Sequence, residues 1–432
     1  MKAVITPAKL AGCVKAPASK SVTHRLLICA ALADRPTDIV CEGTAEDVEA
    51  TARALDQLGS DIVYDRERGL FRVVPARRRP DDCVLDVGES GSTLRFLLPV
   101  VCAMGIKARL RMRGRLPQRP LSPLWEELER HGCSLTRDTD GTVEVQGRLR
   151  GGEFRMASDV SSQFISGLLF ALPLMEEPSF IRLCGPVESE GYIRMTIRAL
   201  EQFGVRTTRE GDVMTVSSAP GKHCADGSAP VRSDGSRRTV NTGYISPGTI
   251  RTEGDWSGAA FWEIAGMLTD GGAGSIACTG LDEYSGQGDR AVRQLKLDIA
   301  RGGAVVDARN VPDLVPALSV LASVSPGRTV FTHAGRLRLK ESDRIRSAVA
   351  MLRSLGGQAE ETEDGFIVHG QDALRGGCVD SFRDHRIVMS AAVASIVCED
   401  KVVISGAEAV GKSYPAFWED FGILGGNVLF EP

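Results

Sequence analysis

One pattern of polar and hydrophobic positions recurs along this chain: a short polar cluster followed by a long apolar run. In one example, Ser161-Ser162-Gln163 precedes Phe164-Ile165 and Leu168-Leu169. Apolar residues three and four positions apart predict a helix, and apolar residues on most of its faces predict that the helix is buried. Further copies begin at Lys20-Ser21, Gly91-Ser92-Thr93, Asp255-Trp256-Ser257, Asp313 and Asp384-His385-Arg386. The sequence therefore predicts several buried helices whose starts carry polar side chains.

A second pattern is a helix that ends at a glycine and is followed by a strand. Its six copies read ALDQLGSDIVY, WEELERHGCSLTR, RALEQFGVRTTR, QLKLDIARGGAVVD, AMLRSLGGQAEET and FWEDFGILGGNVLF. A glycine at this position favours the left-handed conformation that ends a helix, and the residues after it favour a strand. Most copies lie roughly 70 residues apart, the length of a βαβ-containing unit with one more helix and strand. We therefore expect an α/β protein built from six units, three in each half.

Chain length predicts two domains, because 432 residues exceed what one hydrophobic core comfortably holds. The interval from Gly204 to Gly302 is about 30 residues longer than the repeat. It contains a segment, residues 217–248, that is rich in Gly, Ser, Pro and charged residues. We interpret this segment as a surface excursion that ends where the chain crosses between domains, near residues 249–255. The alternative is a long surface loop inside one domain.

Composition and charge exclude several classes of protein. Hydrophobic residues make up 43% of the chain and charged residues 25%, and the net charge of −4 argues against a nucleic-acid partner. The longest apolar stretches, residues 94–106 and 164–175, are too short to cross a membrane. The eleven cysteines form no C-x-x-C pair, and the N-terminus has no signal-peptide pattern. These features predict reduced thiols and a cytoplasmic location.

The most informative stretch for chemistry is Arg338-Leu339-Lys340-Glu341-Ser342-Asp343-Arg344. A helix is predicted to begin here, capped by Ser342 or Asp343, so that its free N–H groups lie beside Lys340 and Arg344. Such a helix start is suited to binding a phosphate or carboxylate. Glu341 is then a carboxylate available for proton transfer. Taken alone, the stretch is equally well explained as a solvated helix start.

The other helix starts carry related chemistry. Lys20, Ser21 and Arg25 combine a point charge, a hydroxyl and a guanidinium fork, which together suit a phosphate, although a capped amphipathic helix is the alternative. Ser161-Ser162-Gln163 offers neutral donors and acceptors for a polyhydroxylated ligand, or is simply a helix cap. Asp313 is a catalytic candidate only if it lies beside Glu341, because two carboxylates could then act as the acid and the base on one substrate. Otherwise it is a helix cap. Arg386 is expected to point into a cleft, where it would contact a carboxylate. We therefore expect one shared cleft for anionic ligands.

Residues 406–413, GAEAVGKS, match the P-loop pattern G-x-x-x-x-G-K-[ST] and follow a strand-like segment. However, Pro415 falls where the first turn of the phosphate-binding helix should be. Only about 20 residues then remain, whereas a P-loop usually opens a nucleotide-binding sheet. We therefore reject a nucleotide-hydrolysing enzyme or kinase and keep Lys412 as a candidate phosphate ligand.

In their order and spacing, these segments resemble the 5-enolpyruvylshikimate-3-phosphate (EPSP) synthases, also called 3-phosphoshikimate 1-carboxyvinyltransferases. The resemblance runs from about Lys2 to Phe430 and rests on SKSVTHR, GSTLR, SSQFISGLL, GYIRMTI, EGDWSGAAF, VPDLVPALSVLA, RLKESDR, DHRIVMS and GKSYPAFWED. It implies a two-domain inside-out α/β barrel, the enolpyruvyl transferase fold, with three βαβαββ units per domain and buried helices. Domain I would comprise residues 1–18 and 253–432, and domain II residues 19–252. The chain would cross between them near residues 14–20 and 249–255.

The resemblance also implies a reaction, in which the enolpyruvyl group of phosphoenolpyruvate is transferred to the 5-hydroxyl of shikimate 3-phosphate and phosphate is released. It implies a monomer that needs no metal or other cofactor. Shikimate 3-phosphate would be held by Lys20, Ser21, Arg25, Ser161, Ser162, Gln163, Ser189, Asp313 and Lys340. Phosphoenolpyruvate would be held by Lys20, Gly91, Arg119, Gln163, Arg344, Arg386 and Lys412. Asp313 would accept the hydroxyl proton, Glu341 would protonate the methylene carbon, and Lys20 would contact both ligands.

The chain departs from the family pattern at a few positions. The run Arg115-Leu116-Pro117 is shorter than usual and lacks the acidic residue and serine found there in many members. Glu190 stands where a basic residue is usual, Arg194 where aspartate is common, and Arg336 where some members use asparagine. The sister family that acts on UDP-N-acetylglucosamine is the alternative. It would need Lys-Asn instead of Lys20-Ser21 and a cysteine before Arg119, and no cysteine occurs between Cys102 and Cys133.

Overall fold

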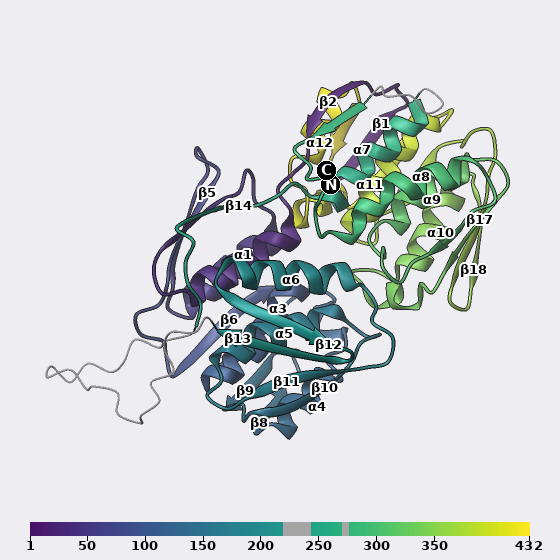
Figure 1. Cartoon of the computed structure of the whole chain (residues 1–432). Helices are drawn as coiled ribbons and strands as arrows, with labels where there is room; N and C mark the ends of the chain where they lie inside the picture. The colour runs from purple at the N-terminus through teal and green to yellow at the C-terminus, as the bar shows by residue number, and fades with distance from the viewer. Residues whose placement is uncertain (219–242, 270–275) are drawn as a thin grey trace, which may run out of the picture.

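A computed structural model of the chain describes residues 1–218, 243–269 and 276–432. Two separate hydrophobic cores organise it, and they form the lower and upper parts of Figure 1. The first core draws its residues from Leu26 to Tyr244. The second core combines the N-terminal residues Ala3 to Val14 with residues from Trp256 to Leu424. Most of the predicted excursion at 217–248 lies outside the described residues.

Three sheets surround the first core. The first contains β14 (Thr249–Arg251), β3 (Thr37–Val40), β5 (Leu70–Val74) and β4 (Asp61–Asp65), with helices α1 (Lys20–Leu32) and α2 (Glu46–Gln57). The second contains β6 (Asp82–Gly88), β7 (Lys107–Met112), β9 (Val143–Gly147) and β8 (Cys133–Arg137), with α3 (Gly91–Met104) and α4 (Leu124–Arg130). The third contains β10 (Gly152–Ala157), β11 (Ser179–Cys184), β13 (Val213–Ser218) and β12 (Val205–Glu210), with α5 (Ser162–Ala171) and α6 (Glu190–Gln202).

Three more sheets surround the second core. The smallest pairs β15 (Ile276–Thr279) with β2 (Gly12–Lys15) and is accompanied by α7 (Trp256–Thr269) and α8 (Val292–Ala300). The next contains β16 (Val305–Asp307), β17 (Arg328–Thr332), β19 (Gly365–His369) and β18 (Gln358–Thr362), with α9 (Val315–Ser323) and α10 (Arg344–Ser354). The last contains β20 (Gly377–Asp380), β21 (Val402–Ser405), β1 (Lys2–Thr6) and β22 (Asn427–Glu431), with α11 (His385–Ala394) and α12 (Phe417–Ile423).

The repeated helix–glycine–strand unit is confirmed. The glycine that ends each of the six helices has a positive φ: Gly59, Gly132, Gly204, Gly302, Gly356 and Gly425. After α2, α4, α6, α10 and α12, the following strand lies at the edge of its own sheet, paired antiparallel to its neighbour. After α8, however, the strand β16 pairs with β17 of the next sheet. The unit of α7 and α8 is therefore the short one, with two strands in the described part of the chain.

The chain passes between the two cores at two places that lie side by side. The backbone N–H of Ser19 donates to the carbonyl of Glu253 at 2.8 Å, and that of Asp255 donates to the carbonyl of Pro17 at 2.8 Å. These bonds flank an antiparallel bridge between Ala18 and Gly254. The two crossing segments therefore support each other.

Helices fill both cores, as the apolar patterns predict. In α3, α5, α9 and α11, nearly every residue is buried. Because these helices bury apolar residues on all faces, the sheets lie outside them. The polar clusters at the starts of helices from both cores are left to meet where the cores face each other.

Candidate functional site

One pocket lies between the two cores. Its walls contain every residue predicted for the site except Lys412: Lys20, Ser21, Arg25, Gly91, Arg119, Ser161, Ser162, Gln163, Ser189, Asp313, Lys340, Glu341, Arg344 and Arg386. The first nine come from the part of the chain that builds the first core, and the others come from the part that builds the second core. The predicted shared cleft is therefore present, and eight lysine or arginine side chains line it against three carboxylates.

Capping side chains hold the starts of α3, α5 and α10, which border the pocket. The Ser90 hydroxyl accepts from the N–H of Thr93 at α3, and the Ser161 hydroxyl accepts from that of Gln163 at α5. Asp343 caps α10, which settles the choice left open between Ser342 and Asp343. Capping fixes the first turn of each helix, and these first turns carry the ligand-binding side chains.

Arg344 is the centre of the charged network on the side of the second core. Its guanidinium contacts Asp313 at 2.7 Å, Glu341 at 2.6 Å and Asp384 at 2.8 Å. The Arg344 side chain is 2% exposed and that of Asp384 is fully buried. Burial acts to lower the pKa of Arg344, but the three carboxylates raise it above its ordinary value. Arg344 therefore stays charged and fixes the positions of Asp313 and Glu341.

Asp313 is surrounded by donors. It accepts from Arg386 Nη2 at 2.9 Å and from the Tyr192 hydroxyl at 2.8 Å, and Lys340 Nζ lies 3.6 Å away. Burial acts to raise the pKa of Asp313, but Arg386, Lys340 and Arg344 together hold it well below its usual range. The side chain is therefore ionised.

Glu341 lies between the two cores. One oxygen bonds Arg344, and the other is 3.3 Å from Arg119 Nη1 of the first core. Although burial acts to raise the pKa of Glu341, Arg344 and Arg119 hold it well below its usual value. Burial lowers the pKa of the neighbouring Lys340 to about 8. An anion that binds beside these cations would offset their effect and raise the pKa of Glu341.

The first core holds its arginines differently. Arg25 donates to the Thr196 hydroxyl at 2.8 Å and to the carbonyl oxygens of Ser21 and Tyr192. Arg95 donates to Gln163 Oε1 at 2.8 Å and to the carbonyl of Pro120 at 3.2 Å. Burial lowers the pKa of Arg25 to about 10 and lowers that of Arg95 well below its usual value. Both cations thus have neutral hydrogen-bond partners.

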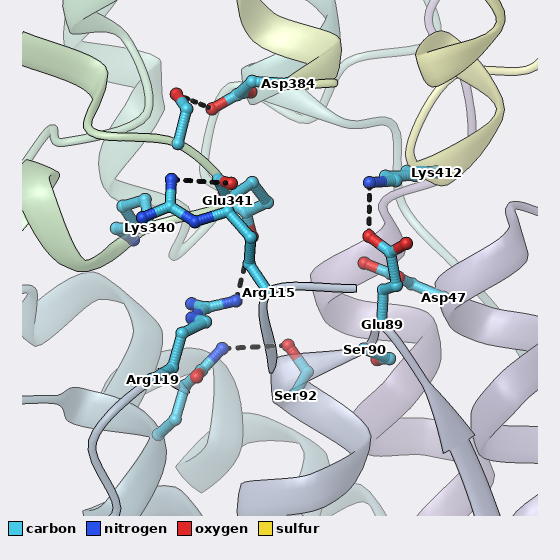
Figure 2. A network of polar contacts seen from close by, with 12 residues as sticks. Asp47, Glu89, Ser90, Ser92, Arg115, Arg119, Lys340, Glu341, Asp384 and Lys412 are labelled. Carbon is cyan, nitrogen blue, oxygen red and sulfur yellow. Dashed lines mark hydrogen bonds and ion pairs between the residues drawn. The ribbon is translucent and has the colours of Figure 1, made fainter. Parts of the chain in front are cut away.

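Lys412 lies apart from the pocket walls. Its Nζ is 2.6 Å from Glu89 Oε2 and 3.2 Å from the carbonyl of Arg383. Figure 2 shows this pair on the right and the Arg119–Glu341 region on the left. Because Glu89 directly precedes the Ser90 cap of α3, the pair still joins the two cores near Gly91. The P-loop interpretation was rightly rejected, because residues Ala407–Lys412 form a 3-10 helix and the next α-helix begins only at Phe417.

Sequence reasoning missed several pocket residues: Asp47, Ser92, Arg95, Tyr192 and His385 line the walls without having been given a role. The sequence did contain a signal for Arg95, because a charged residue in the apolar run of α3 must find buried partners. No such signal marks Asp47, since it stands in an acidic helix start that is typical of any solvated helix. Its carboxylate lies 2.9 Å from Lys20 Nζ.

In the described ranges, no three His, Cys, Asp or Glu side chains form a group suited to a metal ion. None of the described helices has the length and apolar character needed to cross a lipid bilayer.

Comparison with known proteins adds sequence relatives. The family model described as "EPSP synthase (3-phosphoshikimate 1-carboxyvinyltransferase)" matches residues 4–238 and 226–421. A 3-phosphoshikimate 1-carboxyvinyltransferase from Clostridium kluyveri is 37% identical over 447 residues, which cover 98% of this chain and 97% of that protein. The corresponding protein from Clostridium perfringens is 36% identical, with 98% of each chain covered.

Solved structures show the same fold. An EPSP synthase from Acinetobacter baumannii superposes with a TM-score of 0.77 at 24% identity, covering 99% of this chain and all of that one. The enolpyruvyl transferase NikO from Streptomyces tendae reaches a TM-score of 0.72 at 14% identity, covering 99% and 98% of the two chains. The predicted α/β fold of repeated units with buried helices is confirmed.

Proposed function

This chain belongs to the EPSP synthase (3-phosphoshikimate 1-carboxyvinyltransferase) family and is a transferase of the shikimate pathway, and from this premise we propose how its pocket carries out the reaction. The reaction transfers the enolpyruvyl group of phosphoenolpyruvate to the 5-hydroxyl of shikimate 3-phosphate. Both substrates are anions that repel each other. The observation that supports our assignment is one pocket whose cations come from both cores.

Shikimate 3-phosphate is proposed to lie against the helix starts of the first core. Arg25, whose buried guanidinium has only neutral partners, would meet the anionic groups of this substrate. Ser21, Ser161, Ser162, Gln163 and Ser189 supply hydroxyl and amide groups, while Lys20, Lys340 and Asp313 complete the set. A phosphate at the starts of α1 and α5 also meets free backbone N–H groups.

Phosphoenolpyruvate is proposed to lie between Arg119 and the second core. Arg344 and Arg386 would hold it from one side, while Arg119, Gln163 and the backbone at Gly91 would hold it from the other. Lys20 would contact both ligands. Lys412 would join them after leaving Glu89, with which it is paired in this structure.

The proposed chemistry divides between two carboxylates. Asp313 would accept the proton of the attacking hydroxyl, because it is ionised and held by Arg344, Arg386 and Tyr192. Glu341 would donate a proton to the methylene carbon of phosphoenolpyruvate. The binding of this anion beside Arg119 and Arg344 would raise the pKa of Glu341 and allow it to carry that proton.

The elimination step then needs no further group. Protonation of the methylene carbon leaves positive character on the adjacent carbon, which the 5-hydroxyl oxygen attacks to give a tetrahedral adduct. The Glu341 carboxylate left by the first step would take a proton back from the methyl group of that adduct, and cleavage of the C–O bond to phosphate would restore the double bond. The cations around the phosphate would stabilise the leaving group.

Domain organisation and assembly are also proposals. We infer that domain I comprises residues 1–18 and 253–432 and domain II residues 19–252. The hydrogen-bonded crossings at 14–20 and 249–255 would act as the hinge, and closure would exclude water. The enzyme is proposed to act as a cytoplasmic monomer without metal, nucleotide or nucleic acid.

The test is phosphate release from phosphoenolpyruvate by the purified protein. Release is expected only when shikimate 3-phosphate is present. UDP-N-acetylglucosamine, the acceptor of the sister family, is the matched control and should give no release. Equal release with either acceptor, or none with both, contradicts the proposed function.

A further inference from the structure

Four buried polar side chains form a continuous chain of hydrogen bonds inside the first core. Nδ1 of His24 in α1 lies 2.7 Å from the Thr51 hydroxyl of α2, which lies 2.6 Å from the Thr93 hydroxyl of α3. Thr93 donates to the Ser90 hydroxyl at 2.7 Å, and Ser90 is the N-cap of α3. All four side chains are fully buried. The chain therefore links three helices through polar groups within a hydrophobic core.

The direction of these hydrogen bonds follows from the number of hydrogens available, because a hydroxyl group carries only one. Thr93 gives its hydrogen to Ser90, so Thr51 must donate to Thr93. His24 must then donate to Thr51 through Nδ1, which leaves Nε2 without a hydrogen. Burial, together with two neighbouring cations, holds the pKa of His24 well below its ordinary value and keeps the ring neutral. Nε2 has no hydrogen-bond partner in the described part of the chain.

Polar groups in this position cost stability. Apolar side chains of similar size would fill the space without the desolvation of three hydroxyls and an imidazole, one of whose nitrogens is left without a partner. What the hydrogen bonds supply instead is direction, because a buried polar network fixes one arrangement of the groups that it joins. The network thus fixes the start of α3 relative to α1 and α2.

The start of α3 carries groups that face the pocket. Gly91 and Ser92 directly follow the Ser90 cap and line the pocket, and Figure 2 shows Ser90 and Ser92 at this helix start. Arg119 rests against Gly91, since a Cβ added to this glycine would lie 2.9 Å from Arg119 Nη1. The Ser92 hydroxyl accepts from Gln163 Nε2 at 2.9 Å. A shift of this helix start would therefore move three of the groups proposed to hold phosphoenolpyruvate.

We propose that His24, Thr51 and Thr93 are positioning residues for phosphoenolpyruvate, which act through the Ser90 cap on the start of α3. This inference rests on the proposed function, which places phosphoenolpyruvate against that helix start and the side chains that rest on it. None of the three is among the described residues that line the pocket, so they act without touching the ligand.

Steady-state kinetics of Thr51→Val test the proposal, because valine keeps the shape of threonine and removes the central hydroxyl. The KM for phosphoenolpyruvate should rise about 3- to 10-fold, the range expected for a lost neutral hydrogen bond. The KM for shikimate 3-phosphate should stay within about twofold, because the hydroxyls and cations proposed to hold it lie outside α3. The kcat should stay within about threefold, since the two carboxylates that move protons belong to the second core.

Two further variants of the chain sharpen this test. Thr51→Ser restores the hydroxyl without the methyl group, and should return the KM for phosphoenolpyruvate to within about twofold of the wild-type value. A side chain needed only for packing would not be rescued in this way. Thr93→Val removes the next hydroxyl but keeps the bond from the backbone N–H of residue 93 to Ser90 at 3.2 Å. It should give the same selective rise, and it replaces Thr51→Val if that variant does not fold.

Thr37→Val is the matched control. Thr37 belongs to β3 of the same core, is fully buried, and its hydroxyl lies 2.7 Å from that of Ser246. The control therefore loses a comparable buried hydrogen bond away from the pocket. Denaturant unfolding should show a loss of stability similar to that of Thr51→Val, whereas both KM values should stay within about twofold of the wild type.

The tautomer of His24 is a separate test that uses the wild-type protein. Nitrogen NMR of histidine-labelled protein should show Nδ1 protonated and Nε2 bare at neutral pH, with the signal identified by its loss in His24→Gln. The opposite neutral tautomer would overturn the proposal. Thr51 would then have to donate to His24, and its hydrogen bond to Thr93 could not form.

The kinetic results can overturn the proposal in three ways. An unchanged KM for phosphoenolpyruvate in Thr51→Val and Thr93→Val would mean that the chain does not position this ligand. Equal rises in both KM values with a fall in kcat would mean that it only stabilises the core, and failure of Thr51→Ser to restore the KM would mean that packing alone matters. Failure of the proposed function is seen separately, because the wild-type protein would then release no phosphate with shikimate 3-phosphate.

Discussion

Two buried arginines of the first core and two of the second have opposite electrostatic surroundings in one pocket. In the first core, Arg25 and Arg95 bond hydroxyl, amide and carbonyl oxygens. In the second core, Arg344 and Arg386 bond carboxylates. Their pKa values move in opposite directions: burial lowers those of Arg25 and Arg95, whereas the carboxylates raise those of Arg344 and Arg386 despite burial.

This difference indicates that the two groups of arginines have different tasks, one in binding the substrate and the other in positioning the groups that carry out the reaction. A buried cation with neutral partners carries a desolvation cost, which an anionic ligand can offset. The first core therefore leaves charge for the substrate to neutralise. In the second core, the cations are largely neutralised by Asp313, Glu341 and Asp384, and what they supply is the fixed position of the two carboxylates that move protons.

The largest effect is expected for the carboxylates of the second core. Glu341→Ala and Asp313→Ala should each lower kcat by about 100- to 10,000-fold, the usual contribution of a positioned acid or base. Substrate affinity should largely persist, because the arginines and serines remain. Turnover and calorimetric binding of both ligands measure the two quantities. Wild-type turnover in either variant would remove that residue from the mechanism.

Asp384 is next, because it is a buried partner of Arg344. Asp384→Asn should lower the free energy of unfolding by about 3–5 kcal/mol, since it leaves a buried cation short of a counter-charge. Denaturant unfolding measures this loss. A loss below about 1 kcal/mol would mean that Asp313 and Glu341 suffice to compensate Arg344.

The first core should respond in the opposite way. Arg25→Met should weaken the binding of shikimate 3-phosphate about 10- to 100-fold. The free energy of unfolding should stay the same or rise, because the substitution removes a buried charge with no carboxylate partner. Calorimetry and denaturant unfolding give the two values. A large loss of stability with unchanged binding would reverse the roles assigned to the two cores.

The pH dependence of binding sharpens the comparison at Lys340. Burial lowers its pKa from 10.5 to about 8, so it loses its charge as the pH rises through 8. Affinity for shikimate 3-phosphate should therefore fall, by up to about tenfold between pH 8 and 9. Lys340→Arg should remove this dependence. Between pH values of about 8 and 10.5, Lys340 is protonated in the unfolded chain but largely neutral in the folded protein. The contribution of Lys340 to the free energy of unfolding therefore rises with pH over this range.

The smallest effect is expected for the pair of Glu89 and Lys412, in which the carboxylate is partly exposed. Glu89→Gln should change the free energy of unfolding by less than about 1 kcal/mol, because the Glu89 side chain is 38% exposed and solvent screens the pair. It is the exposed counterpart of Asp384→Asn, since both convert a carboxylate to an amide. A loss as large as that of the buried variant would show that this pair, too, is essential to the arrangement of the cores.

Local patterns predicted the parts of this protein well. The helix starts at Lys20, Gly91, Ser162, Arg344 and His385 lie where the polar-to-apolar transitions placed them. The glycines after six helices have the predicted left-handed backbone. Both predictions depend only on residues that are close together in the chain, so they can be made without knowledge of the tertiary structure.

The partners of the charged residues could not be predicted in this way. Nothing near Tyr192 in the sequence indicates that its hydroxyl reaches Asp313, and nothing near Lys412 indicates Glu89. The strand β1 completes the last sheet, and β14 completes the first, through contacts between segments far apart in the chain. Such pairings follow from how the sheets close around the cores.

The sequence by itself therefore determined the kinds of element, their polar ends and the chemistry that those ends carry, because helix caps and apolar periodicity are local properties. Only the tertiary structure decided which arginines meet carboxylates and which meet neutral oxygens. That choice depends on which helix starts face each other across the pocket, and the electrostatic energy depends on those distances and on burial, neither of which is written in residue spacing.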